Sequence, residues 1–246
     1  MATLVLAIGT WLRSRARRDV SIIDSMWPWL ICAPGVVAMM LARTAAARGF
    51  LILVLAGLWA VRLSAHITLR HRGHPEDHRY QAIRARNQPD FEWKSLYLVF
   101  GLQAALGWIV AMPLVAAATR TASWHVLDVA GAALFAFGFL FEAIADAQLT
   151  RFRANAALRG QVLDSGLWRY SRHPNYFGEC CVWWGLWLIA ASTGAWWTIV
   201  SPLLMTVLLL KVSGVALLES GIATRRPAYA SYIRRTSAFF PRPPRA

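Results

Sequence analysis

One short stretch of the chain concentrates reactive and charged side chains. Residues 170–179 read Tyr-Ser-Arg-His-Pro-Asn-Tyr-Phe-Gly-Glu, which places two cations, an amide, two phenols and a carboxylate within ten residues. Long apolar runs lie on both sides. Polar side chains are costly to keep beside membrane-facing sequence, so this density favours a ligand-binding role. The alternative is a basic loop whose long side chains snorkel to a membrane surface.

A second set of polar residues precedes this stretch. Glu142 and Asp146 are four residues apart and share one face of a predicted helix, and Arg153 continues the same stripe seven residues later. Paired carboxylates can exchange protons or accept hydrogen bonds from a ribose or an amide. The alternative is that they hold arginines at the end of the helix.

A third set lies in the first part of the chain. Asp24 precedes Met-Trp-Pro-Trp, and we predict that Pro28 breaks a helix turn there. Asp24 could bind a polar atom of a substrate or pair with an arginine such as Arg18. Arg62 and His66 share a helix face, and a buried arginine needs an anion, whether for function or as a structural ion pair.

The C-terminal tail is the fourth polar segment. It carries Glu219, Arg225, Arg226, Tyr229, Tyr232, Arg234 and Arg235, followed by Phe239-Phe-Pro. The two tyrosines are three residues apart and would lie on one side of a helix. The tail is either an amphipathic anchor at the membrane surface or a lid packed against residues 150–179.

The elements that position these residues are predicted to be membrane-spanning helices. Of the 246 residues, 57% are hydrophobic and only 15% are charged, whereas soluble domains carry about 25% charged residues. The apolar runs approach the roughly 20 residues that cross a bilayer as a helix. We therefore predict an all-α, polytopic transmembrane bundle that forms a single domain over residues 1–246. The seven predicted spans are residues 1–12, 20–42, 49–69, 95–117, 124–149, 176–192 and 196–218.

The basic residues divide unequally between the two ends of these spans. Segments 13–18, 70–94, 150–175 and 219–246 carry 21 Lys and Arg, whereas the alternate loops carry three. Because cytoplasmic loops are enriched in Lys and Arg, we expect the two long loops and the C-terminus to be cytoplasmic, as in a bacterial inner membrane protein. Anionic lipid then explains the net charge of +14 without a nucleic-acid partner.

Metal and common nucleotide-binding patterns are not found in the sequence. The three cysteines lie in apolar sequence without metal-ligand spacing, and Pro75 interrupts the His71, His74 and His78 group. There is also no Gly-x-Gly-x-x-Gly motif and no Gly-Lys-Ser/Thr loop. Any dinucleotide would have to be held by dispersed arginines and aromatic residues, and the 150–179 segment supplies both.

With these residues assembled, the chain resembles the steroid 5-alpha-reductase-like family of membrane reductases, in particular its bacterial branch. The resemblance covers nearly all of the chain and is strongest over residues 140–179, where Arg-His-Pro-Asn-Tyr-Phe-Gly-Glu is followed by Trp183 and Trp184. Sterol C14-reductases carry a similar stretch. Isoprenylcysteine methyltransferases share Arg-His-Pro-x-Tyr and a tail with spaced tyrosines.

The resemblance implies an enzyme that uses NADPH to reduce a carbon–carbon double bond conjugated to a carbonyl in a steroid or another lipid. Asn175 and Glu179 match positions that hold the nicotinamide, and Asp146 and Arg153 match other cofactor-binding positions. Glu142 stands where the family has an asparagine, and an arginine expected near Gln161 is missing. The cofactor site implied in this way is completed by Arg172, His173, Tyr176, Glu219, Arg225, Tyr229 and Tyr232.

The substrate end departs from the family pattern. Steroid reductases grip the substrate carbonyl with a Gln-Glu pair and a tyrosine in the next helix, but the third predicted span here has no tyrosine. Asp24, His66 and Tyr80 are the candidates for donating a hydrogen bond to the carbonyl. We expect Asp24 to be the donor, because burial would raise its pKa and keep it protonated.

Two other functions fit the same residues. An S-adenosylmethionine-dependent lipid or isoprenoid methyltransferase could use Arg172 and His173 in the same crevice, and a non-catalytic protein could simply bind lipid. The expected partners are therefore membrane lipids and an apolar, steroid-like small molecule, with no metal.

Overall fold

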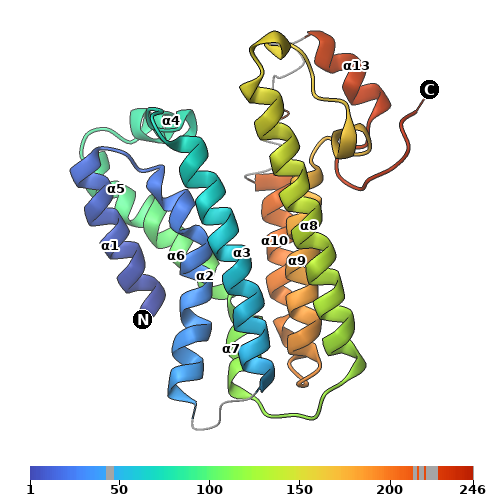
Figure 1. Cartoon of the computed structure of the whole chain (residues 1–246). Helices are drawn as coiled ribbons and strands as arrows, with labels where there is room; N and C mark the ends of the chain where they lie inside the picture. Colours follow the sequence, from blue (N-terminus) through green and yellow to red (C-terminus); the bar gives the residue numbers. More distant parts are fainter. Residues whose placement is uncertain (43–46, 213–214, 216–218, 220–226, 246) are drawn as a thin grey trace. The chain divides into compact units, whose positions relative to one another are not determined.

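The computed structural model describes residues 1–245 except 43–46, 213–214, 216–218 and 220–226, and these described parts are helical with no named strand (Figure 1). The elements are α1 Ala2–Arg17, α2 Ile22–Leu41, α3 Ala47–His71, α4 His78–Arg86, α5 Phe91–Ser95, η1 Leu96–Gly101, α6 Leu102–Val110, α7 Met112–Thr119, α8 Val126–Ala154, η2 Ala156–Leu158, η3 Gly166–Arg169, α9 Pro174–Ala191, η4 Trp196–Ile199, α10 Val200–Val207, η5 Leu208–Val212 and α13 Pro227–Arg235.

The protein is an integral membrane protein. Among the described residues, four helical stretches are long and apolar enough to cross a membrane: Ile22–Leu41, Ala47–His71, Phe91–Val110 and Val126–Ala154. They correspond to the second to fifth predicted spans. The first, sixth and seventh predicted spans coincide with α1, α9 and the η4–α10–η5 stretch, and their crossing of the membrane stays a prediction.

The chain folds as two compact units. Unit 1 comprises residues 1–124 and 189–201, and unit 2 comprises residues 125–188 and 202–246. The single membrane domain predicted from the sequence would include both. Each unit holds one of the polar clusters described below.

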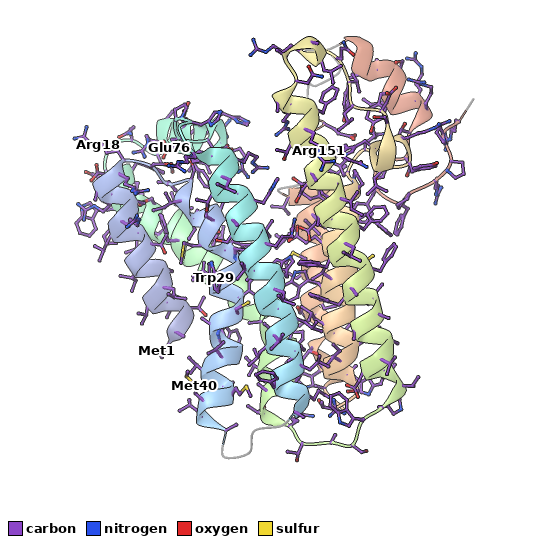
Figure 2. All side chains as sticks on the ribbon, viewed as in Figure 1. Met1, Arg18, Trp29, Met40, Glu76 and Arg151 are labelled. Carbon is purple, nitrogen blue, oxygen red and sulfur yellow. The ribbon has the colours of Figure 1, made fainter. Side chains whose placement is uncertain are left out.

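Unit 1 is built around α2, which packs against α1, α3, α6 and α7. Contrary to our expectation, Pro28 does not break α2, which runs through it without interruption. A proline frees carbonyl groups in the preceding turn, and these need new partners inside a membrane. The Ser64 hydroxyl of α3 supplies one, because it donates to the Ser25 carbonyl at 2.7 Å. Trp59 of α3 is fully buried. Figure 2 draws the side chains of the described residues.

The fourth predicted span, residues 95–117, is divided in the structure. Its helix begins earlier, at Phe91, and α6 gives way to α7 at Ala111, where Pro113 occupies the first turn of the new helix. Proline suits that position because its missing N–H has no partner there in any helix. Within the long segment, η1 is a π-helical stretch that ends just before Gln103. Such stretches change the direction of the side chains that follow and are common at functional sites.

Unit 2 is organised by the antiparallel pair α8 and α9, which run side by side in Figure 1. Glycines meet where the two backbones touch. A Cβ added at Gly138 would lie 2.6 Å from the Gly178 carbonyl oxygen, and one added at Gly185 would lie 2.6 Å from that of Gly131. Small residues permit this close approach between helices in a membrane. The same approach brings Glu142 against Gly178, so the glycines fix which polar side chains of α8 face those of α9.

Candidate functional site

The polar cluster of unit 1 depends on the short helix α4. Asp77 caps this helix by accepting the Arg79 backbone N–H at 2.9 Å, and its own N–H donates to the Ser21 hydroxyl at 2.7 Å. The Glu76 carboxylate accepts the Val20 N–H at 2.9 Å and holds Arg84 at 2.8 Å. Side-chain capping of this kind stabilises a helix start by about 1 kcal/mol. These bonds fasten α4 to the segment that begins α2.

This fastening brings Tyr80 to Asp24. The Tyr80 hydroxyl donates to Asp24 Oδ1 at 2.5 Å, and Arg79 binds Asp24 Oδ2 at 2.7 Å. The Gln103 amide donates to the Tyr80 oxygen at 3.1 Å. Tyr80 is only 6% exposed and packs in the hydrophobic core of unit 1. Two of the three predicted catalytic residues therefore form one hydrogen-bonded group.

The geometry changes the role expected for Asp24. In this arrangement Asp24 accepts from Arg79 and from the Tyr80 hydroxyl, so the geometry favours Tyr80 over Asp24 as the donor to a substrate, and the catalytic role of either residue stays a prediction. The donor of the pair is Tyr80. Burial, followed by the charge of Asp24 and its hydrogen bond, raises the pKa of Tyr80 well above its usual value. The phenol consequently stays protonated at neutral pH. Asp24 also pairs with Arg79 and not with Arg18, the partner considered from the sequence.

The sequence reasoning missed two members of this cluster. Arg79 neutralises Asp24 and also binds Asp77 at 2.9 Å. Gln103 is an uncharged polar residue inside an apolar run, and this was the available signal for it. His66, the third predicted catalytic residue, is half-buried on α3, and its catalytic role stays a prediction.

The polar cluster of unit 2 begins with carboxylates of α8 and α9. The Asn175 amide donates to Asp146 Oδ1 at 3.1 Å. Glu142, Asp146 and Glu179 are buried, with exposures of 2%, 5% and 8%. The structure thus joins two of the residues that the family resemblance assigns to the cofactor. Buried acceptors of this kind suit the hydroxyl and amide donors of a ribose or a carboxamide, whereas they would repel phosphate.

Arg172 has a different environment from the one we predicted. Its Nε and Nη2 bind both oxygens of Glu219, at 2.7 and 2.8 Å. Its Nη1 donates to the carbonyl oxygens of Ile233 at 3.1 Å and Thr236 at 2.5 Å. All three nitrogens are thus engaged within the protein, and the side chain is buried. Arg172 stabilises the fold, and a direct contact with a cofactor phosphate would require breaking these bonds.

His173 and Glu219 complete this corner. The His173 Nε2 lies 3.0 Å from Glu219 Oε1, and the histidine ring stacks on Tyr176 with centroids 5.6 Å apart. Burial opposes ionisation of Glu219, but the hydrogen bonds from His173 and Arg172 outweigh it and lower the pKa of Glu219 to about 2. Glu219 is therefore ionised across the physiological pH range.

The tail packs against the segment that precedes α9, as one of the two sequence hypotheses required. The Tyr232 hydroxyl donates to the Trp168 carbonyl, Ser171 donates to the Phe239 carbonyl at 2.8 Å, and Ser171 and Ser237 form a β-bridge. Tyr229 packs edge-on against Tyr232 with centroids 5.3 Å apart. Packing against residues 150–179 is confirmed, and a lid movement stays a prediction.

Of the two remaining predicted cofactor residues, the structure describes only one. Arg153 is exposed near the end of α8. Arg225 lies outside the described residues. In the part of the chain that the structure describes, no group of three or more His, Cys, Asp or Glu side chains could hold a metal ion.

The structure describes a helical integral membrane protein with one buried polar cluster in each of its two units. The chain belongs to a protein family of unknown function, DUF1295, whose model matches residues 10–236. That match includes both polar clusters. Comparisons with curated proteins and with solved structures find no significant match.

Proposed function

We propose that the protein is an NADPH-dependent membrane reductase of the steroid 5-alpha-reductase-like type. Its substrate would be a steroid-like or other lipid in which a carbon–carbon double bond is conjugated to a carbonyl. The observation that carries the proposal is the buried Tyr80 phenol, hydrogen-bonded to Asp24 and Gln103. A reductase of this type needs a neutral donor that polarises the carbonyl, whereas a methyltransferase does not.

Tyr80 would act by hydrogen bonding to the carbonyl oxygen of the substrate. Its raised pKa keeps the hydroxyl protonated, and Asp24 and Gln103 hold the phenol in a fixed orientation. To reach the substrate, the hydroxyl proton would turn away from Asp24, whose charge Arg79 continues to balance. The hydrogen bond strengthens as negative charge develops on the oxygen, so it lowers the barrier.

NADPH, when bound, supplies the hydride that adds to the β-carbon, and a proton from water completes the α-carbon. In unit 2, Asp146 and Asn175 form a donor–acceptor pair that fits a carboxamide or a ribose, with Glu142 and Glu179 as further acceptors. Arg153, which is exposed near the end of α8, is the residue that we propose to contact a phosphate of the cofactor. Arg172, His173 and Glu219 would support this site by fixing the start of α9.

We also infer a seven-span topology with a cytoplasmic C-terminus in a bacterial inner membrane. The four candidate spans and the division of 21 basic residues against three support it. A cysteine-accessibility scan of the tail in sealed, oriented vesicles tests the C-terminal side. Labelling from the cytoplasmic face alone is expected, and labelling from the opposite face would contradict the topology.

A thermal-shift comparison tests the cofactor. The purified full-length protein is heated with NADPH, NADH or S-adenosylmethionine, and stabilisation should increase with the logarithm of the concentration of a bound ligand. We expect a shift with NADPH. The Tyr80→Phe variant serves as a matched control, because it should keep the NADPH shift and lose turnover of a lipid enone. A shift with S-adenosylmethionine alone would instead support the methyltransferase, and no shift with any of the three would support a lipid-binding protein.

A further inference from the structure

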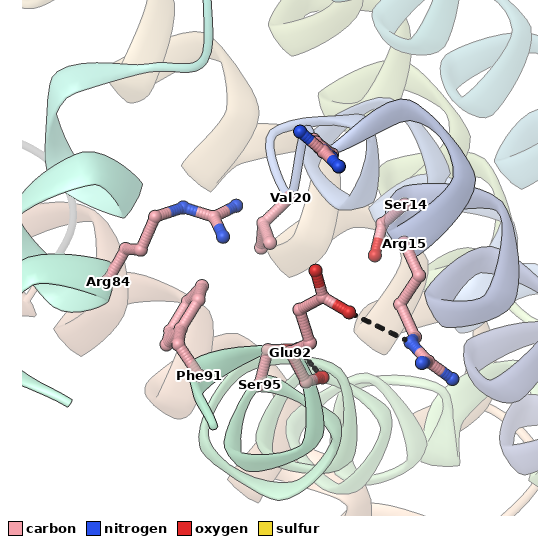
Figure 3. Close-up of a pocket in the computed structure, with 8 residues that line it drawn as sticks. Ser14, Arg15, Val20, Arg84, Phe91, Glu92 and Ser95 are labelled. Carbon is pink, nitrogen blue, oxygen red and sulfur yellow. Dashed lines mark hydrogen bonds and ion pairs between the residues drawn. The ribbon is translucent and has the colours of Figure 1, made fainter. Parts of the chain in front are cut away.

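Unit 1 also contains a small pocket that shares no lining residue with the Tyr80 cluster and is rich in arginine. It is lined by Arg15 and Arg18 from the end of α1, Arg84 from α4, and Phe91, Glu92 and Ser95 from α5, together with Ser14 and Val20 (Figure 3). Three arginines therefore line one pocket whose own lining has a single carboxylate, and Arg84 is in addition paired with Glu76 outside the lining. The proposed reductase chemistry uses none of the three.

Two of the three arginines of this pocket, Arg15 and Arg84, lie against aromatic rings. The Arg15 guanidinium lies 5.0 Å from the ring centroid of Trp11 and 4.5 Å from that of Trp93. The Arg84 guanidinium lies 4.7 Å from the centroid of Phe91. Stacking on an aromatic face orients a guanidinium without using its N–H donors. Arg84 already donates to both oxygens of Glu76, at 2.9 and 2.8 Å, so Arg15 and Arg18 are the arginines of the pocket that can meet an anion.

The other polar groups of the pocket indicate that its ligand is negatively charged. The Ser14 and Ser95 hydroxyls donate to carbonyl groups of their own helices, so the guanidiniums are the main donors toward the pocket. Glu92 is half-exposed and lies 3.5 Å from Arg15 Nε, a long separation for an ion pair. Figure 3 shows its carboxylate between Arg15 and Arg84. An external anion would compete with Glu92 for these arginines.

The pocket lies at the start of two candidate membrane spans, which is the level at which lipid headgroups are expected. The candidate spans Ile22–Leu41 and Phe91–Val110 both begin beside it, since Val20 and Phe91 line it. Trp93 and Tyr97 follow on the same stretch and are 58% and 62% exposed. Exposed tryptophan and tyrosine mark the interface between membrane and water, and basic pockets at that level bind anionic headgroups.

We propose that this pocket binds a phosphate group, carried either by an anionic lipid headgroup or by free phosphate. Guanidinium groups bind phosphate oxygens through paired, charge-assisted hydrogen bonds. Arg18 is the most informative residue, because it ends α1 in a left-handed conformation with φ 52° and is exposed at the pocket. Arg17, its neighbour, is also exposed but does not line the pocket.

Retention of phosphatidylglycerol, measured by native mass spectrometry of the full-length protein, tests the proposal. Phosphatidylcholine is the neutral comparison lipid, and the variants are Arg18→Gln, Arg17→Gln and Glu92→Gln. We expect Arg18→Gln to weaken phosphatidylglycerol binding about tenfold, because one charge-assisted bond is lost. Arg17→Gln should change it less than about twofold, since it removes only distant charge. Glu92→Gln should strengthen binding, because it removes the competing carboxylate.

Inorganic phosphate distinguishes the two sources of the ligand. If phosphate alone stabilises the wild type against heat, and Arg18→Gln but not Arg17→Gln abolishes that effect, the pocket takes free phosphate. If only phosphatidylglycerol shows this difference, the ligand is a lipid. Equal effects of Arg17→Gln and Arg18→Gln in both experiments would overturn the proposal, because they would indicate general attraction of charge to an anionic surface.

Discussion

The polar clusters of the two units differ in the kind of group to which their side chains form hydrogen bonds. In unit 1, Asp24, Arg79, Tyr80 and Gln103 bond mainly to one another, side chain to side chain. In unit 2, Arg172 bonds to two main-chain carbonyls as well as to Glu219. A buried side-chain network is costly unless every member is satisfied, and it can be changed without moving the backbone. A side chain that ties main-chain segments together holds the fold itself.

This difference separates the expected consequences of mutation. Changes in the unit 1 cluster should affect turnover before stability, and changes at Arg172 should affect stability before ligand binding.

The largest effect is expected for Arg172→Ala. Removing this guanidinium leaves Glu219 partly buried without its strongest partner, and breaking a buried ion pair costs about 3–5 kcal/mol. Denaturant unfolding in detergent measures the change in the free energy of unfolding. Arg169→Ala, which changes an exposed arginine three residues away, is the control and should change it little. Normal stability with lost NADPH binding would instead make Arg172 a ligand residue.

Tyr80→Phe should lower kcat by about 10²–10³-fold, as does the loss of one donor to a developing oxyanion. The aromatic ring remains in the core and Asp24 keeps its pairing with Arg79, so the thermal unfolding temperature should fall less than in Arg172→Ala. Steady-state kinetics with a lipid enone measures the first quantity and a thermal scan the second. Unfolding without a specific loss of turnover would remove the contrast between the two clusters.

Gly138→Ala should reduce the free energy of unfolding by about 1–3 kcal/mol, because the added methyl group would lie 2.6 Å from the Gly178 carbonyl oxygen. Gly57→Ala in α3 is the matched control, since a Cβ there meets nothing within 4 Å. The control should be neutral or slightly stabilising. An equal response at both glycines would contradict the close contact of α8 with α9.

Asn175→Ala should raise the Kd for NADPH about tenfold, since it removes a hydrogen-bonding group beside Asp146. Fluorescence titration of NADPH measures the Kd. Asn87→Ala is a suitable control, because Asn87 lies in unit 1 and bonds to its own helix. Unchanged affinity in Asn175→Ala would separate this residue from the cofactor.

Glu219 should make stability depend on pH. Its pKa is lowered from 4.5 to about 2 in the folded protein. The carboxylate therefore stabilises the fold above pH 4.5, and this stabilisation is lost as the pH falls toward 2. Thermal scans at decreasing pH should show the difference between wild type and Glu219→Gln shrinking below about pH 4.5. A difference that stays constant with pH would contradict the ionised Glu219.

The sequence predicted the long apolar helices better than the interruptions within them and the short polar helix between them. The apolar runs located α2, α3 and α8 to within a few residues, because hydropathy alone determines which segments can enter a membrane. The same measure could not detect the interruption at Ala111, which is a local effect of Pro113, nor the short polar helix α4. Aspartate at position 77 followed by a helical segment was the signal that could have predicted α4.

The two clusters were predictable to different degrees. The contact of Asp146 with Asn175 agrees with what the family resemblance implies, because both residues lie in the conspicuous 140–179 region. Tyr80 and Asp24 are 56 residues apart, and only the packing of α4 against the start of α2 brings them together. The internal bonding of Arg172 was hidden for a similar reason, since its partners lie more than 45 residues away in the tail.

Transfer of deuterium tests the central claim most directly. The purified protein is incubated with NADPH deuterated at the nicotinamide and with a membrane-soluble lipid enone, and the product is analysed by mass spectrometry and NMR. We expect one deuterium at the β-carbon with the wild type, and a loss of this product in Tyr80→Phe even though that variant still binds NADPH. Equal product formation by the wild type and Tyr80→Phe would contradict the role of the phenol, and the absence of transfer across a panel of lipid enones by a wild type that binds NADPH would contradict the reductase.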